Sequence, residues 1–216
     1  MHKGMTLAEM AREIHENAKA HGWWDEEREA AEVYALIHSE WSEALEEYRA
    51  DRPDRWYECD SNVWPDVCDE QSKKDCPYHR PEGKCVFQGA KPEGVCVELI
   101  DGVIRILDYI AHCGEADKYN KGTDWCFEMC GKEGEKWTNE VRAMSLPALV
   151  NKLHNNVHLA WTCKRLKDEK KETEEMLEAA RVAWQWIKGR GLDPEELLIE
   201  KHEYNVTRPY KHGKVC

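Results

Sequence analysis

Between residues 95 and 111 the chain reads Val95-Cys-Val-Glu-Leu-Ile-Asp-Gly-Val-Ile-Arg-Ile-Leu-Asp-Tyr-Ile-Ala111. The segment is apolar around most of a helical circumference, which is typical of a helix buried at the centre of a domain. Its charges fall on one narrow stripe, formed by Glu98, Asp101, Arg105 and Asp108. Buried carboxylates are costly unless they are paired or bind a metal, and one arginine offsets only part of their charge. The segment therefore predicts a cation site on a central helix.

A second acidic pair, Glu40 and Glu43, lies on a helix predicted at residues 27–50. A spacing of three places both carboxylates of a pair on one helical face, one turn apart. Acidic residues are 43 of 216, so chance alone gives such a pair about once per 25 positions, and a single pair is no more than a solvated helix face. Two facing helices that each carry a pair can bind Mg²⁺ through carboxylate oxygens. The candidate ligands are Glu40, Glu43, Glu98 and Asp101.

Other segments predict further helices, while strand signals are scarce. Thr6 and Glu9 form a capping-box pattern at the start of a helix that ends near Gly22. Ser145 followed by Pro147 is typical of another helix start. Further helices are predicted at residues 145–164, at 167–188, and from 193 to just before Pro209. The predicted fold is an all-α bundle in a single domain over residues 1–216.

Two segments lack helical periodicity, residues 51–92 and residues 114–144, and both are predicted to be irregular insertions between helices. The first is rich in cysteine and contains five candidate ligands of a structural Zn²⁺ ion: Cys59, Cys68, Cys76, His79 and Cys85. Thiol and imidazole ligands would stabilise a loop that builds no core of its own. Free thiols are the alternative, because only Cys76 and His79 have the two-residue gap of common zinc motifs. Cys126 and Cys130 give a weaker signal, since helical spacing alone makes them neighbours.

Charge and composition exclude several classes of partner. The formal net charge is −12, which argues against nucleic acid, because binding to its backbone needs a basic surface. No apolar run of about 18 residues is present, so no membrane partner is expected. The first residues lack the apolar core of a signal peptide, so a cytoplasmic location is expected. The ten cysteines are then expected to be thiols or metal ligands rather than disulfides.

The acidic half-motifs Glu40-x-x-Glu43 and Glu98-x-x-Asp101 resemble those of the all-α nucleoside triphosphate pyrophosphohydrolases. This MazG-like superfamily includes dCTP pyrophosphatases, dimeric dUTPases and MazG-like proteins of bacteria and phages. Residues 14–25 resemble the N-terminal segment of the dCTP-pyrophosphatase type, and residues 201–210 resemble the family's C-terminal K-x-x-x-N segment. The resemblance covers roughly residues 6–50, 91–112 and 193–213. The 54 residues between Glu43 and Glu98 are a departure, since relatives usually have a short loop there.

The resemblance implies a Mg²⁺-dependent hydrolase, with Mn²⁺ as an alternative ion, whose substrate is a nucleoside triphosphate. An NTP or dNTP would become the monophosphate plus pyrophosphate by attack of water at the α-phosphorus. The four carboxylates would hold the metal, which bridges phosphate oxygens and lowers the pKa of bound water. Glu43 or Glu47 would act as the base that orients this water.

The resemblance also implies substrate-binding residues at both ends of the chain. His15 and Trp24 would hold the base, although Trp23 and Trp24 also fit an apolar plug that ends the first helix. Lys201 and Arg208 would neutralise phosphate charge and Asn205 would donate a hydrogen bond, while the alternative for Lys201 is an ordinary surface lysine. Tyr210 belongs to the same segment. His38 points away from Glu40, which favours packing or a hydrogen bond to a metal ligand.

A non-catalytic nucleotide- or metal-binding interaction protein on the same fold is the alternative function, because the cysteine-rich insertion exceeds what catalysis requires. Members of the family usually assemble as homodimers or homotetramers. The nearly all-round apolar helix at residues 95–111 is consistent with such an assembly.

Overall fold

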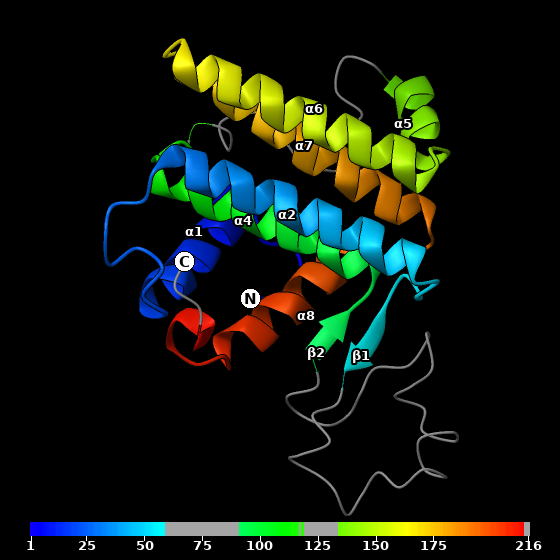
Figure 1. Ribbon diagram of the computed structural model, residues 1–216, viewed down its shortest axis with the longest axis horizontal. Helices are drawn as coiled ribbons and strands as arrows, with labels where there is room; N and C mark the ends of the chain where they lie inside the picture. Colours follow the sequence, from blue (N-terminus) through cyan, green and yellow to red (C-terminus); the bar gives the residue numbers. More distant parts are fainter. Residues whose placement is uncertain (59–90, 117, 119–133, 214–216) are drawn as a thin grey trace, which may run out of the picture.

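The computed structural model describes residues 1–58, 91–116, 118 and 134–213. This part of the chain is mostly helical, which confirms the predicted helical class (Figure 1). Its α-helices are α1 (Leu7–Ala20), α2 (Ala30–Arg49), α4 (Val95–His112), α5 (Gly134–Arg142), α6 (Leu146–Arg165), α7 (Glu169–Gly189) and α8 (Pro194–Val206). The remaining elements are the short strands β1 (Trp56–Glu58) and β2 (Lys91–Glu93) and the 3-10 helix η4 (Tyr210–Gly213). The candidate zinc ligands and the Cys126/Cys130 pair lie outside the described residues.

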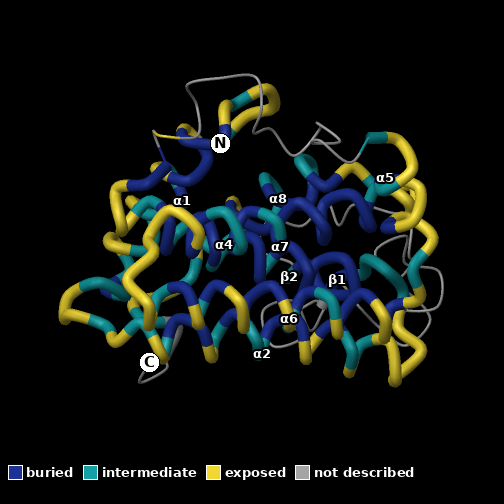
Figure 2. The backbone as a smooth tube through the Cα atoms, turned by 90° about the horizontal axis from the view of Figure 1, so that it is seen from above, coloured by how far each residue is buried: buried dark blue, intermediate teal, exposed yellow. Residues whose placement is uncertain are grey.

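The helices form three layers (Figure 1). Helices α6 and α7 make one layer, α2 and α4 make the next, and α1 and α8 pack on the far side of α4. Figure 2 shows buried residues gathered where α4 and α7 run through the middle of the molecule. None of the helices in the described ranges is long and apolar enough to cross a membrane.

Local sequence signals define the ends of the two helices in the third layer. In α1 the backbone N–H of Glu9 donates to the Thr6 hydroxyl at 3.3 Å, and the Thr6 N–H donates to the Glu9 carboxylate at 2.7 Å, so the predicted capping box forms. Asp193 caps α8 by accepting from the N–H of Glu195 at 3.1 Å. A cap of this kind contributes about 1 kcal/mol and fixes where each helix enters the bundle.

Helix α4 is covered within the chain. It contacts α1, α2, α7 and α8, and most of its residues are buried. The apolar circumference predicted at residues 95–111 is therefore explained without a second copy of the chain. The expected homodimer or homotetramer stays a prediction that this helix no longer supports.

The prediction that both insertions are irregular is wrong in part. Residues 134–142 form α5, whose Trp137 lies under the guanidinium of Arg181 on α7, 3.8 Å from the ring centroid. Only a short apolar spacing marks this helix in a Lys- and Gly-rich segment, so its periodicity is weak. At the ends of the cysteine-rich insertion, β1 pairs antiparallel with β2, and Tyr57 lies opposite Pro92. Three-residue strands are too short to show an alternating pattern.

Gly102 allows α2 and α4 to pack closely. A Cβ atom at this position would lie 2.0 Å from Nε1 of Trp41, which is fully buried on α2. The contact lies between the two acidic pairs, because Trp41 follows Glu40 and Gly102 follows Asp101. It therefore controls how far the carboxylates of one helix stand from those of the other.

We expect Gly102→Ala to destabilise the protein. Overpacking of a core typically costs about 1–3 kcal/mol, more than the roughly 1 kcal/mol that alanine gains over glycine within a helix. Urea unfolding measures the difference. The double variant with Trp41→Phe should recover part of the loss, because phenylalanine removes the indole atoms that a Cβ would meet. A Gly102→Ala protein as stable as the wild type would contradict the contact.

Candidate functional site

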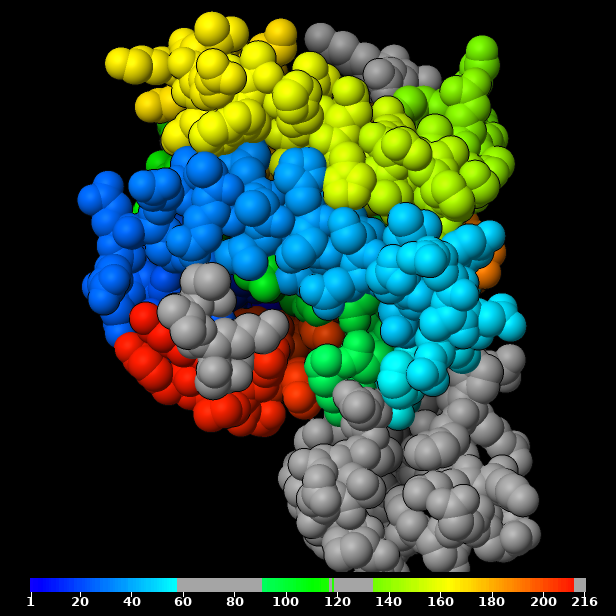
Figure 3. Space-filling model, viewed as in Figure 1, coloured from blue at the N-terminus to red at the C-terminus, as the bar shows by residue number. Residues whose placement is uncertain are grey.

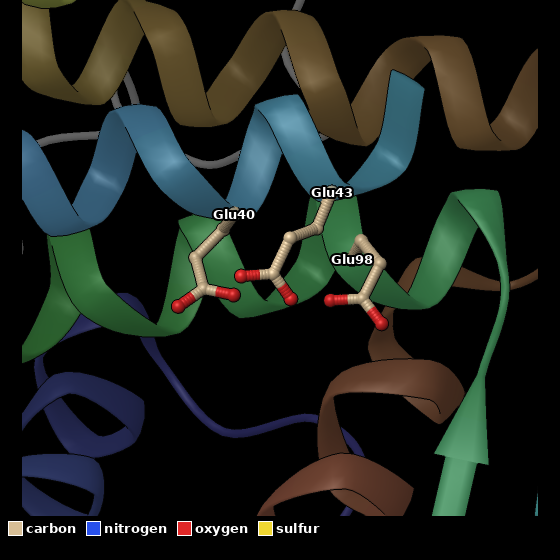
Figure 4. A group of neighbouring side chains, drawn as sticks. All are labelled: Glu40, Glu43 and Glu98. Atoms are coloured by element: carbon tan, nitrogen blue, oxygen red, sulfur yellow. The ribbon is translucent and has the colours of Figure 1, made fainter. Parts of the chain in front are cut away.

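Three of the predicted metal ligands meet in space. Glu40 and Glu43 come from α2 and Glu98 from α4, and one carboxylate oxygen of each lies within 4.8 Å of those of the other two. Figure 4 shows the three carboxylates pointing the same way, away from the α6–α7 layer. Glu40 is 6% exposed and Glu98 is 4% exposed, whereas Glu43 is exposed to solvent. Two buried carboxylates and one accessible carboxylate thus share one small volume.

Asp101, the fourth predicted ligand, is held by Lys201 of α8. The Lys201 ammonium lies 2.9 Å from the Asp101 carboxylate and donates to the carbonyl of Pro92 at 3.0 Å. Lys201 is only 2% exposed, so the alternative of an ordinary surface lysine is wrong. Burial works against its charge, but the carboxylates of Asp101 and Glu98 outweigh burial and raise the pKa of the ammonium. Lys201 is therefore a permanent positive charge beside the carboxylates.

Arg105, one turn after Asp101, forms an ion pair with Glu40 through its Nε. The pKa of Glu40 is nevertheless raised, chiefly by burial and further by the charges of Asp101 and Glu43, while Arg105 opposes the shift. Burial of Glu40 therefore works against the charged form that Arg105 stabilises.

Glu93 of β2 is a further carboxylate that sequence reasoning missed. It is buried, pairs with Lys91, and shares a hydrogen bond with Glu98. Burial, the charge of Asp101 and this hydrogen bond raise the pKa of Glu98 to about 10. Burial opposes the charge on Glu93, but hydrogen bonds from Glu98 and Lys91 lower its pKa. Without a metal, Glu98 is thus the protonated partner of the pair at neutral pH.

A pocket of about 150 Å³ lies in the hollow between α2 and α8 (Figure 3). Its acidic lining consists of Glu40, Glu43, Glu98, Asp101 and Asp108. Its basic lining consists of Arg28, Lys91, Arg105, Lys201 and Arg208. The whole charged stripe of α4 faces this space. A ligand here would meet carboxylates and cations together.

His15 and Trp24 meet at Asp108, the last carboxylate of the stripe. Nδ1 of His15 lies 2.7 Å from Asp108, and Nε1 of Trp24 donates to it at 3.0 Å. The Trp24 ring stacks on His112 with centroids 3.8 Å apart. The pocket lining includes Trp23 rather than Trp24. The two predicted base-binding residues are therefore brought together at the pocket's edge by Asp108.

The C-terminal residues are divided between the pocket and the surface. Asn205 and Arg208 line the pocket. Tyr210 is 60% exposed, and its hydroxyl donates to Asp25. The tail is fixed against the end of α1, where Nε2 of His21 lies 2.9 Å from the carbonyl oxygen of Arg208. The structure thus brings Asn205 and Arg208 to the carboxylates but leaves Tyr210 outside the pocket lining.

Glu47, the second candidate base, also lies outside the pocket lining. Its carboxylate accepts a hydrogen bond from Nε1 of Trp56 at 2.7 Å, next to the start of β1. Glu43 is the accessible member of the carboxylate cluster. Of the two candidates, Glu43 is therefore the one that lines the pocket.

Comparison of the chain with models of known protein families, with characterised proteins and with solved structures gives no match. Function is therefore inferred from the side chains themselves. Hard oxygen donors from two helices suit Mg²⁺ or Mn²⁺, which prefer carboxylates and phosphate oxygens. Burial and neighbouring carboxylates raise the pKa of both Glu40 and Glu98, and a cation bound to them would favour their ionised forms.

Because the pKa of Glu98 is raised in the folded state, we expect metal-free protein to lose stability as pH rises. The folded state keeps a proton on Glu98 up to about pH 10, whereas the unfolded chain loses it near the usual glutamate pKa. Between about pH 5 and pH 9 the folded state binds more protons, so the free energy of unfolding falls with pH. Glu98→Gln should remove this contribution to the pH dependence. The difference in free energy of unfolding between the variant and the wild type should therefore grow by up to about 1.4 kcal/mol per pH unit as pH rises.

Urea unfolding in EDTA at several pH values measures that gap. Glu46→Gln, at an exposed position on α2, is the matched control and should follow the wild type. Parallel curves for the wild type and Glu98→Gln would show that Glu98 ionises normally.

Proposed function

We propose that the protein is a Mg²⁺-dependent nucleoside triphosphate pyrophosphohydrolase of the MazG-like all-α class. It would convert an NTP or dNTP to the monophosphate plus pyrophosphate by attack of water at the α-phosphorus. The observation that carries the proposal is the cluster of Glu40, Glu43 and Glu98, contributed by two helices inside a pocket that also holds basic side chains. Carboxylates for a metal and cations for phosphates are the two requirements of phosphoryl-group chemistry.

The donor set fits Mg²⁺. Glu40, Glu43 and Glu98 would hold the ion, and Asp101 stands one turn from Glu98 on the same face of α4. When bound, the ion would neutralise phosphate charge and make a water more acidic. Asp101 is oriented by Lys201 and Glu40 by Arg105, so both carboxylates are held in place beforehand.

The remaining side chains of the pocket would bind the phosphates and accept a proton. Lys91, Arg105 and Arg208 line the pocket and would face the triphosphate, where each cation offsets phosphate charge. Glu43 would accept the proton of the attacking water. The water oxygen then bonds to the α-phosphorus, the bond from that phosphorus to the bridging oxygen breaks, and pyrophosphate leaves with the electron pair.

Nucleoside contacts would come from the α1 end of the pocket. Trp23 and Asn17 line it, and the Arg28 guanidinium lies 5.6 Å from the Trp23 ring centroid. His15 and Trp24 lie outside the lining and are both bonded to Asp108, which lines the pocket, so Trp23 is the tryptophan that would meet the base. An aromatic face of this kind suits stacking on a base.

We expect pyrophosphate release from NTPs or dNTPs to require Mg²⁺ and to stop in EDTA. Glu98→Gln should reduce the rate by about a hundredfold or more, because one of the carboxylates that would hold the ion is lost. Glu46→Gln is the control, since it makes the same change on an exposed turn of α2 and should keep the wild-type rate. A panel of canonical and modified nucleotides identifies the substrate. Absence of release by folded wild-type protein would contradict an enzymatic role and favour a non-catalytic binding protein.

Glu43 and Glu47 make separate predictions for the base. Glu43→Gln should lower kcat by about 10²–10⁴-fold, the usual contribution of a positioned general base. Glu47→Gln should leave kcat nearly unchanged, because glutamine still accepts the hydrogen bond from Trp56. Single-turnover measurements at saturating Mg²⁺ compare the two variants. The reverse ranking would assign the base to Glu47.

A further inference from the structure

A second cavity, of about 250 Å³, lies where α4 and α6 end and α7 begins, at one end of the bundle (Figure 1). Among the described residues that line it, three are acidic, Glu115, Glu169 and Glu172, and one is basic, Lys164. None of these four lines the pocket between α2 and α8. An inference about this cavity therefore does not rest on the proposed hydrolase activity.

Glu172 of α7 is the most deeply buried of the three carboxylates, at 3% exposed. One of its oxygens, Oε1, accepts from the hydroxyl of Tyr34 at 2.9 Å and from the hydroxyl of Tyr109 at 2.8 Å. Burial and the Glu172 carboxylate raise the pKa of both tyrosines, so both keep the proton that they donate. No described residue donates a hydrogen bond to the other oxygen, Oε2. A buried acceptor without a donor is costly, so Oε2 is a contact point for a group that brings a proton.

Lys164 of α6 offsets the charge of Glu172 only in part. Its ammonium lies 3.5 Å from Oε1, farther than the roughly 2.7–2.9 Å of a hydrogen bond between charged groups, and its side chain is 35% exposed. The same ammonium lies 5.6 Å from the centroid of the Tyr109 ring. The wall of the cavity thus already holds one ammonium between a carboxylate and an aromatic face.

The other two carboxylates stand apart from Glu172. Glu115 is buried and pairs with Lys118 at 2.5 Å, whereas Glu169 is exposed in the first turn of α7. Among the described residues, only the cluster on α2 and α4 brings three possible ligand atoms together for one metal ion. The carboxylates of the second cavity are therefore not gathered around one point. Separated carboxylates suit an extended cation with more than one charged group.

We propose that this cavity binds an aliphatic polyamine, a chain of methylene groups that carries protonated amines. One ammonium would donate to Oε2 of Glu172, and a second would reach the exposed carboxylate of Glu169. The methylene groups between them would lie against Ile110 and Met176, which also line the cavity, and would bury apolar surface there. An anionic ligand would instead meet three carboxylates and one ammonium.

Isothermal titration calorimetry of the full chain with spermidine tests the proposal, with excess Mg²⁺ to occupy the other pocket. Glu172→Gln should weaken binding by about tenfold or more, the usual cost of a lost hydrogen bond to a charged group. Glutamine still accepts from both tyrosines, and far-UV circular dichroism checks that the variant folds. Glu169→Gln, at an exposed position, carries the same test without a buried change and should weaken binding by about twofold to fivefold. Glu46→Gln removes the same charge outside the cavity and should bind as the wild type does.

Two further measurements separate this site from the general attraction of a cation to an acidic protein. Lys164→Met should strengthen spermidine binding by about twofold or more, because it removes a competing ammonium and keeps the length of the side chain. Butylamine, which has one amine, should bind more weakly than spermidine and should be less sensitive to Glu169→Gln. Three results would each overturn the site: no spermidine binding to folded wild type, equal affinity in the wild type and both cavity glutamate variants, or weaker binding to Lys164→Met.

Discussion

Helices α2 and α4 pack closely because Gly102 has no side chain and the indole of Trp41 occupies the space where a Cβ atom would lie. The indole N–H is buried and has no hydrogen-bond partner in the described part of the chain, which costs about 1–3 kcal/mol. Close packing offsets this cost and sets the distance between the two acidic pairs. Glu40 and Glu43 can share a small volume with Glu98 only because the helices approach so closely here. A larger residue at position 102 would push the two helices apart and so separate the carboxylates, although none of the carboxylates is itself replaced.

The electrostatics of the pocket follow from this approach. Carboxylates forced together must be neutralised, and the chain does so with Lys201 on Asp101, Arg105 on Glu40, and a proton shared by Glu98 and Glu93. These neutralising groups are also the groups that phosphates would require. A divalent cation that took over the carboxylates would leave Arg105 able to meet a bound triphosphate. In the proposed loaded site the same charges would therefore take up a different pairing.

Much of the fold and of the site could be predicted because the signals are local. Capping boxes and apolar periodicity depend on residues three or four apart, and so does the charged stripe of α4 that lines the pocket. Glu93 could not be found in this way, because it lies in β2, five residues before Glu98 and outside the helix that carries the stripe. The contact of His38 with His154 depends on how α2 and α6 pack, across 116 residues of sequence. Helix α5 was missed because it is short and mostly polar.

The two sides of the α2–α4 layer differ in the kind of side chain that they carry. The side toward α1 and α8 carries the carboxylates and the cations, whereas the side toward α6 and α7 is an apolar interface. Because α6 and α7 cover α2 and α4 within one chain, the layer that bears the acidic pairs is supported without a second copy.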